Sequence, residues 1–233
     1  MSNTSKGPAS KGSKLMMQMA ASPLQKHIID KKIGEELLWL SPIAQNDYEE
    51  YQLSEDEVIN FLGLNTGKAD FKFWPSRQPQ WDGIAVGKDT ATLYLIEAKS
   101  HLKETITDCS ATSDDSKKLI SNTIQDIAKT IYNVNDVKTI KNHWMKDNYQ
   151  LANRLVFLQK MKELSSKAQF YENVKLILLN FVNDPTWDEK ERVTDVKDWK
   201  DHYNSIFDSM GISRDAVEKE GLVEIEYSAP YIY

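Results

Sequence analysis

Asp82, Glu97 and Lys99 are the residues whose types and spacing best suit chemistry in this chain. Glu97 and Lys99 belong to the run Leu-Tyr-Leu-Ile-Glu-Ala-Lys, in which side chains two residues apart share one face of a strand. Two carboxylates form a hard oxygen site of the kind that Mg²⁺ prefers. A nearby ammonium can orient a water molecule and stabilise charge in a phosphorane-like transition state. The trio therefore predicts metal-dependent hydrolysis of a phosphodiester.

A hairpin is the element expected to position the trio. The stretches 82–86 and 90–99 have strand-like composition, and Gly87-Lys88-Asp89 between them is typical of a tight turn. Such a hairpin would bring Asp82 opposite the end of the strand that carries Glu97. That strand has an apolar middle, and charged groups at the end of a buried strand are costly unless they are paired or hold a metal.

Glu-X-Lys is a common tripeptide, so its context decides how it is interpreted. The plain alternative is an ion pair on one face of an exposed strand, which contributes little. The apolar strand, the hairpin and Asp82 together favour the metal site instead.

The rest of the chain predicts helices and strands around this hairpin. Apolar spacing and capping residues predict helices over 24–40 (or two short ones there), 46–62, 112–132, 142–166 and 198–209, and apolar or alternating runs predict further strands over 70–74, 174–182 and 222–227. Residues 1–14, rich in Ser, Gly and Lys, are expected to be a mobile tail, and 15–233 a single domain.

This order of elements resembles the core of the PD-(D/E)XK (restriction-endonuclease-like) nucleases. A helix comes first, then three strands with Asp on the second and Glu-X-Lys on the third, then a helix and a further strand. The segments similar to a bacterial branch of that superfamily are YEEYQ (48–52), FWPSRQPQWDGIAV (73–86), IEAKSHLKE (96–104), YQLANRLVFL (149–158) and LLNFVNDPT (178–186). The resemblance covers most of residues 36–200 and implies an α/β fold, a mixed central β-sheet flanked by helices in αβββαβ order.

The resemblance also implies roles for individual residues. Asp82, Glu97 and the backbone carbonyl of Ala98 would hold Mg²⁺, for which Mn²⁺ can substitute, and Lys99 would be the catalytic lysine. Gln80-Trp81 precedes Asp82 where the motif's name has a proline. This departure weakens only the name of the motif, because the proline is often missing in the superfamily.

An additional acidic residue is often placed on the helix before the first strand in that superfamily. Glu50 is the preferred match and Glu36 the alternative, and either could complete a metal shell. A solvated helix face is the plain interpretation of both.

Further catalytic candidates are Gln150 and His101. Gln150 and Arg154 are four residues apart on one helix face, with Asn153 beside them, and could contact the scissile phosphate or support Lys99. A capping amide and a surface arginine are equally open interpretations. His101 follows Lys99 in phase on the strand, although a lone histidine is more often a satisfied polar residue than a base.

Two sets of residues could bind nucleic acid outside the trio. Trp74, Pro75, Arg77 and Trp81 could stack on unpaired bases, or they could be packing and turn elements. Three lysines on the helix after Asn142 could form a local positive surface, or simply a solvated face: Lys146, Lys160 and Lys162.

Composition limits the partners. The formal net charge of −6 excludes the broad positive field of a non-specific nucleic-acid binder, so a polyanion must be met locally. Cys109 is the only cysteine and cannot form an intramolecular disulfide, which fits a reducing cytoplasm. No apolar run approaches the roughly 20 residues that span a bilayer, so no membrane association is expected.

Three functions are consistent with these features. The first is a Mg²⁺-dependent endonuclease with DNA as the expected polymer and a homodimer as one option. The second is an inactive nuclease-like fold that binds nucleic acid or protein, and the third is a phosphatase or another metal hydrolase. Intact Asp82, Glu97 and Lys99 favour the first, because a module released from chemistry need not retain all three.

Overall fold

A five-stranded sheet forms the centre of the molecule. The computed structural model describes residues 6–65 and 68–229. The strands lie side by side in chain order, and they are β1 (Leu37–Ser41), β2 (Gly83–Gly87), β3 (Thr92–Lys99), β4 (Asn173–Val182) and β5 (Leu222–Ser228). β1, β2 and β3 pair antiparallel, whereas β3, β4 and β5 pair parallel. The expectation of a mixed central sheet in an α/β fold is confirmed.

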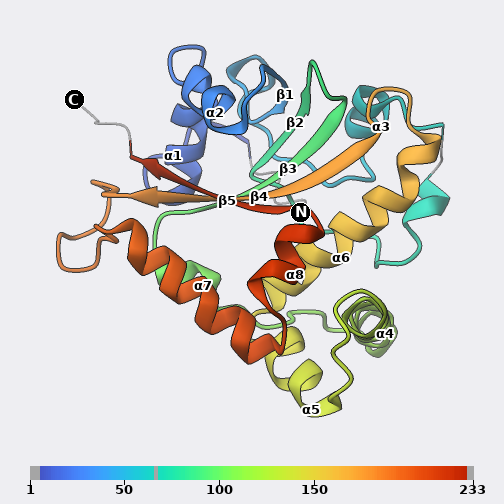
Figure 1. Ribbon diagram of the computed structural model, residues 1–233. Coiled ribbons are helices and arrows are strands. Elements are labelled where there is room, and N and C mark those ends of the chain that lie inside the picture. The colour runs from blue at the N-terminus through green and yellow to red at the C-terminus, as the bar shows by residue number, and fades with distance from the viewer. Residues whose placement is uncertain (1–5, 66–67, 230–233) are drawn as a thin grey trace.

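Helices cover both faces of this sheet (Figure 1). They are α1 (Gly12–Ala20), α2 (Lys26–Ile33), α3 (Asp56–Leu62), α4 (Asp114–Thr130), α5 (Val137–Thr139), α6 (Tyr149–Leu164), α7 (Val196–Met210) and α8 (Arg214–Lys219). Figure 1 shows α1 and α2 on one side of the sheet and α4 to α8 on the other. Within 6–65 and 68–229, none of the helices has the length and apolar character needed to cross a membrane.

The alternation of β3 assigns its side chains to two separate cores. Leu93 and Leu95 belong to the core that also contains α4, α6 and α7 residues, whereas Tyr94, Ile96 and Ala98 pack in the core formed with α1 and α2. Odd-numbered side chains of β3 therefore face α6. This is the face on which the strand presents its final acidic and basic residues.

Glu35 fixes the turn of the β2–β3 hairpin. Its carboxylate accepts hydrogen bonds from the backbone N–H groups of Asp89 and Thr90, the Thr90 hydroxyl and the Tyr94 hydroxyl. A Cβ atom added to Gly87 would overlap this carboxylate. The hairpin predicted from the Gly87 turn is confirmed. The Glu35 carboxylate occupies the space that a side chain at position 87 would need.

The N-terminal region differs from the expected helix and tail. α2 ends at Ile33, because the next residue, Gly34, has a left-handed φ of 97° that stops the helix. Residues 37–41 form the edge strand β1 instead of continuing the helix. The segment expected to be a tail is helical from Gly12. Before that, the Gly7 N–H donates to Asp47 O (2.7 Å) and the Ala9 N–H to Gln18 Oε1 (2.8 Å). These hydrogen bonds from backbone N–H groups tie the segment to the rest of the protein. Residues 1–5 of the expected tail lie outside the described residues.

Two further predicted elements are wrong. The helix expected over 46–62 is confined to Asp56–Leu62, and the residues before it are held instead by a β-bridge between Tyr51 and Trp81. The strand expected over 70–74 is absent: the backbone forms a short 3₁₀ turn at Lys68–Phe71, and Phe71 and Trp74 are buried in the core. Aromatic residues there fill the core without joining the sheet.

The remaining predicted elements are confirmed within a few residues at most ends. Helix 112–132 corresponds to α4, helix 198–209 to α7, strand 174–182 to β4 and strand 222–227 to β5. The helix expected over 142–166 begins later, at Tyr149, because Lys146 has non-helical backbone angles inside the wider helical turn Ile140–Asp147. The short helix α8 was not predicted.

Candidate active site

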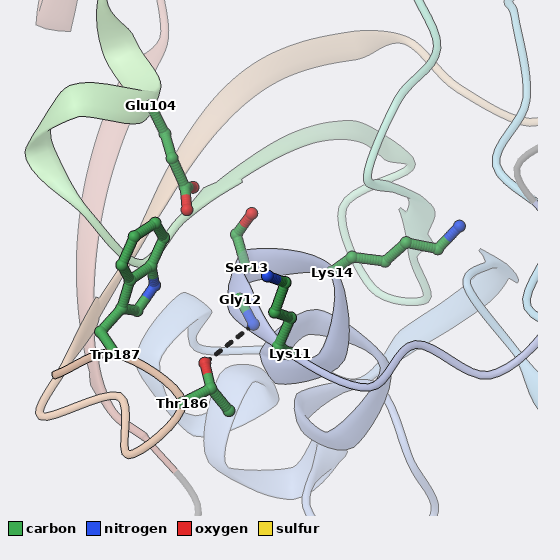
Figure 2. A pocket seen from close by; sticks show the side chains of 7 residues that line it. All are labelled: Lys11, Gly12, Ser13, Lys14, Glu104, Thr186 and Trp187. Carbon is green, nitrogen blue, oxygen red and sulfur yellow. Dashed lines mark hydrogen bonds between the residues drawn. The ribbon is translucent and has the colours of Figure 1, made fainter.

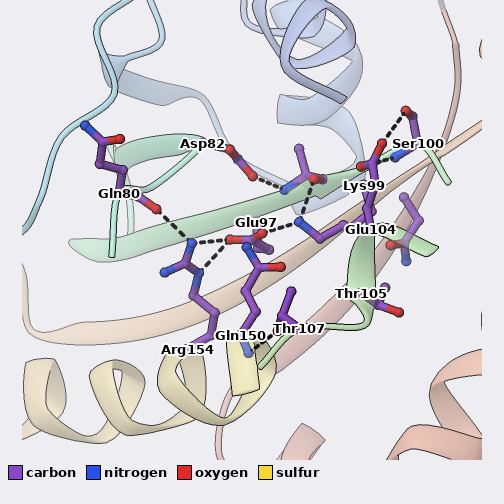
Figure 3. Close-up of polar contacts among 12 residues, drawn as sticks. Gln80, Asp82, Glu97, Lys99, Ser100, Glu104, Thr105, Thr107, Gln150 and Arg154 are labelled. Carbon is purple, nitrogen blue, oxygen red and sulfur yellow. Dashed lines mark hydrogen bonds and ion pairs between the residues drawn. The ribbon is translucent and has the colours of Figure 1, made fainter. Parts of the chain in front are cut away.

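The hairpin brings Asp82, Glu97 and Lys99 together at the carboxyl end of β3 (Figure 3). Glu97 and Lys99 are buried, with 3% and 7% of their surfaces exposed. Asp82 immediately precedes β2, and its Oδ2 accepts a hydrogen bond from the Ala98 N–H (2.8 Å). The three residues thus form one cluster, as the spacing predicts.

Glu97 is held between two cationic side chains. Lys99 Nζ donates to Glu97 Oε1, and Arg154 Nε donates to Glu97 Oε2 (2.5 Å). Arg154 is itself fixed, because its Nη2 donates to Gln80 O (2.7 Å) and its guanidinium lies 4.3 Å from the centre of the Trp81 ring. The ion pair is therefore buried, unlike the exposed surface pair that Glu-X-Lys alone would suggest.

Burial and charge shift the pKa values of the trio in different directions. Burial, and next the charge of Glu97, raise the pKa of Asp82 to about 7. Burial opposes charge on Glu97, but Arg154 and Lys99 outweigh it and hold the pKa of Glu97 below its usual value. Burial likewise opposes charge on Lys99, yet Glu97 and Asp82 raise the pKa of its ammonium. A further cation near Asp82 would therefore relieve unfavourable charge.

Glu50, and not Glu36, lies near the trio. The β-bridge at Tyr51 places Glu50 close enough for its charge to raise the pKa of Asp82. Glu50 comes from an irregular segment rather than a helix, and Lys14 Nζ lies 3.5 Å from its Oε1. Glu36 instead pairs with Lys88 (2.6 Å) beside the hairpin turn, at the opposite end of β2.

The donor set suits a hard cation only in part. Asp82 and Glu97 supply carboxylate oxygens, and the Ala98 carbonyl, which accepts from Lys99 Nζ at 3.2 Å, supplies a third oxygen. Mg²⁺ commonly binds to one or two carboxylates and keeps several waters. Among residues 6–65 and 68–229, no group of three or more His, Cys, Asp or Glu side chains is arranged to hold a metal. These three oxygens would leave the remaining positions of a bound cation to water.

Gln150 and His101 occupy different surroundings. The Gln150 N–H donates to Thr107 Oγ1 (2.7 Å) at the start of α6, and Figure 3 shows its side chain reaching toward Glu97. His101 Nδ1 accepts from the Lys103 N–H (3.0 Å), and its ring lies 4.5 Å from that of Trp187. These contacts favour a capping role for His101 and anchor the backbone of Gln150 at Thr107.

The sequence interpretation missed Asn180 and left the partner of Arg154 open. Asn180 lies in register with Lys99 on the adjacent strand and is fully buried. Its Oδ1 accepts from the Tyr203 hydroxyl (3.3 Å), whereas its Nδ2 has no hydrogen-bond partner within the described ranges. The available signal was an amide side chain directly after four apolar residues in the run VKLILLNFV. The Arg154–Glu97 pair joins residues 57 apart and left no local signal.

Four of the residues considered for a nucleic-acid surface are engaged within the protein, whereas Arg77 and Lys146 are exposed. Trp74 and Trp81 are 4% and 0% exposed and pack edge-on against Phe157, so they are not available to stack on bases. Lys160 pairs with Glu163 (2.9 Å), and Lys162 pairs with Glu220 (2.8 Å). The packing alternative therefore holds for the two tryptophans, and the two lysines belong to a face whose charges are compensated.

Comparison of the chain with protein-family models, curated proteins and solved structures found no match. A functional interpretation therefore rests on the geometry of the cluster and on the resemblance of its motifs.

Proposed function

We propose that this chain is a metal-dependent nuclease with a restriction-endonuclease-like core, cleaving nucleic-acid phosphodiester bonds. The observation that carries the proposal is the meeting of Asp82 and Lys99 around Glu97 and the Ala98 backbone, at the carboxyl end of a buried strand. Ligands commonly bind beyond the carboxyl ends of parallel strands, and β3 and β4 both end at this edge.

Each residue of the cluster has a distinct role in the proposed reaction. Asp82, Glu97 and the Ala98 carbonyl would hold Mg²⁺, or Mn²⁺ in its place. When bound, the ion supplies Lewis acidity and lowers the pKa of a water molecule. Lys99, kept charged by Glu97, donates hydrogen bonds to the attacking water or to a phosphate oxygen. Arg154 fixes the orientation of the Glu97 carboxylate.

The proposed substrate is DNA. The overall charge of −6 requires that its phosphates be met at the cluster and its immediate surroundings.

A binding module without catalysis is the second candidate. Both Glu97 oxygens already have cationic partners, Lys99 and Arg154, so the network satisfies Glu97 without a metal ion. In that case Asp82 is partly protonated near neutral pH, as its pKa of about 7 implies. The two candidates differ in whether Mn²⁺ binds and whether DNA is cut.

The decisive experiment compares wild type with Asp82→Asn and Lys99→Met, with Lys138→Met as a control on an exposed lysine of α5. DNA and RNA panels are incubated with Mg²⁺, Mn²⁺ or EDTA, and Mn²⁺ binding is measured separately by calorimetry. We expect metal-dependent cleavage that falls at least about 100-fold in both site variants. We also expect Mn²⁺ binding to be lost in Asp82→Asn and retained in the control. Cleavage that survives both substitutions, or EDTA, contradicts the proposal.

A further inference from the structure

A cavity of about 290 Å³ lies beside the candidate active site (Figure 2). Its walls are the start of α1 (residues 11–14), Glu104, and the Thr186-Trp187 loop that follows β4. This size is near the lower limit of the roughly 300–1,000 Å³ typical of ligand pockets. The cavity therefore suits one small unit of a ligand.

The cavity is linked to the trio through both of its walls. On one wall, Lys14 Nζ lies 3.5 Å from Glu50 Oε1, and Glu50 is the carboxylate whose charge reaches Asp82. On the other wall, the Glu104 carboxylate accepts from the N–H and hydroxyl of Ser100 (3.3 Å each), the residue directly after Lys99. A ligand in the cavity would therefore lie next to the proposed reaction centre.

The walls are held in place before any ligand arrives. Thr186 Oγ1 accepts from the Gly12 N–H (2.9 Å) and donates to Asp184 Oδ1 (2.7 Å), which joins the loop to the start of α1. Trp187 Nε1 donates to Ser100 Oγ (2.9 Å), so its ring is tied to the end of β3. The Gly12 N–H is therefore already used, and the side chains of the walls are the next groups that a ligand would meet.

Those side chains combine positive charge, a hydroxyl and an aromatic ring. Lys11 is exposed, Lys14 and Ser13 are partly buried, and Trp187 supplies the flat apolar wall. Glu104 is the acidic member, and it is engaged by Ser100. Lys11 thus adds positive charge to the wall, while Figure 2 shows the Lys14 side chain extending away from Trp187, on the side where its ammonium meets Glu50. Lysines that track a backbone, combined with an aromatic platform, are typical of sites for single-stranded nucleic acid.

We propose that this cavity binds one nucleotide of the substrate strand next to the scissile phosphate. Its phosphate would lie against Lys11 and Ser13, with Lys14 next along the wall toward Glu50, and its sugar or base would lie against Trp187. The inference rests on the proposed function, because it identifies the ligand as a polynucleotide strand. Lys11, which is exposed, would supply part of the local positive charge that the acidic composition requires.

The test is binding of a fluorescein-labelled 16-nucleotide DNA single strand in EDTA, measured by fluorescence anisotropy over a range of salt concentrations. Wild type is compared with Lys11→Gln/Lys14→Gln and with the control Lys138→Gln/Lys141→Gln, which removes two exposed lysines near α5. We expect the cavity variant to bind about tenfold more weakly, and its log Kd against log salt slope to fall by about 1, as for the loss of one phosphate contact. The control is expected to match wild type.

A second arm distinguishes a strand from a free nucleotide, since both carry a phosphate. Thymidine 5′-monophosphate is titrated against the labelled strand, and we expect displacement only at much higher concentration than with unlabelled strand. Equal potency of the two competitors, or equal binding by the two lysine variants, overturns the inference.

Cleavage assays on the same variants separate this inference from the proposed function. DNA cleavage by wild type with unchanged binding in Lys11→Gln/Lys14→Gln would leave the nuclease proposal intact and refute the cavity. If Lys11→Gln/Lys14→Gln weakens DNA binding but wild type cleaves no DNA, the cavity inference stands and the nuclease proposal is refuted. A wild-type protein that neither binds nor cleaves DNA refutes both.

Discussion

Replacement of Arg154 by methionine tests whether the buried ion pair organises the cluster. Arg154 and Glu97 side chains are each 4% exposed, and Arg154 also donates to Gln80 O and to Asn153 Oδ1. Arg154→Met leaves these buried acceptors without their donor, at about 1–3 kcal/mol for an unpaired buried group. Removal of one partner from a buried ion pair typically costs about 3–5 kcal/mol. We therefore expect a loss of roughly 3–5 kcal/mol in the free energy of unfolding.

Urea unfolding at neutral pH with EDTA measures this loss, and thermal unfolding should show a fall of roughly 6–20 °C for a chain of this size. Lys160→Met is the matched control on the same helix, since it breaks the more exposed pair with Glu163 and should cost at most about 1 kcal/mol. Adding Glu97→Gln to Arg154→Met should recover at least about 1 kcal/mol, because the amide needs no counter-ion. An Arg154→Met protein as stable as Lys160→Met would refute this account of the cluster.

Two further predictions concern pH and the hairpin. Because the pKa of Asp82 is raised from 3.8 to about 7 in the folded protein, its stabilising contribution is present below about pH 4 and is lost as the pH rises through 7. Wild type should therefore lose roughly 2–3 kcal/mol more than Asp82→Asn between pH 5 and 8 in EDTA, and urea unfolding curves that change in parallel would contradict this. Gly87→Ala should displace the Glu35 carboxylate and cost about 2–4 kcal/mol, measured by the same unfolding assay against Glu35→Ala. If Gly87→Ala is tolerated within about 0.5 kcal/mol, Glu35 does not clamp the turn as described.

Much of the sheet could be predicted because local sequence determines it. The strands β2 and β3 share a tight turn, and β4 and β5 are short apolar or alternating runs between turn residues. The hairpin alone places Asp82 beside Ala98, so this part of the site followed from spacing. By contrast, the apolar residues of β1 also fit a helical period, and pairing with β2 decides their conformation.

The parts that failed depend on contacts between distant segments. Glu50 reaches the site through the bridge between Tyr51 and Trp81, not through a helix. Phe71 is strand-like in isolation but serves as a core residue. Arg154 meets Glu97 only when α6 packs on β3. Sequence spacing within one element identifies a shared face, whereas the partner opposite that face is a property of the assembled fold.

The Arg154–Glu97 pair also has a consequence for folding order. The hairpin contains Asp82, Glu97 and Lys99 within a short stretch. The second cationic partner of Glu97, Arg154, is on α6, which follows β3 only after α4 and α5. Contacts of long sequence separation generally form late. We expect Glu97 to remain hydrated until α6 docks. If α6 packed on β3 one residue out of register, the Glu97 carboxylate would be buried without Arg154. This cost disfavours misaligned packing of α6 during folding.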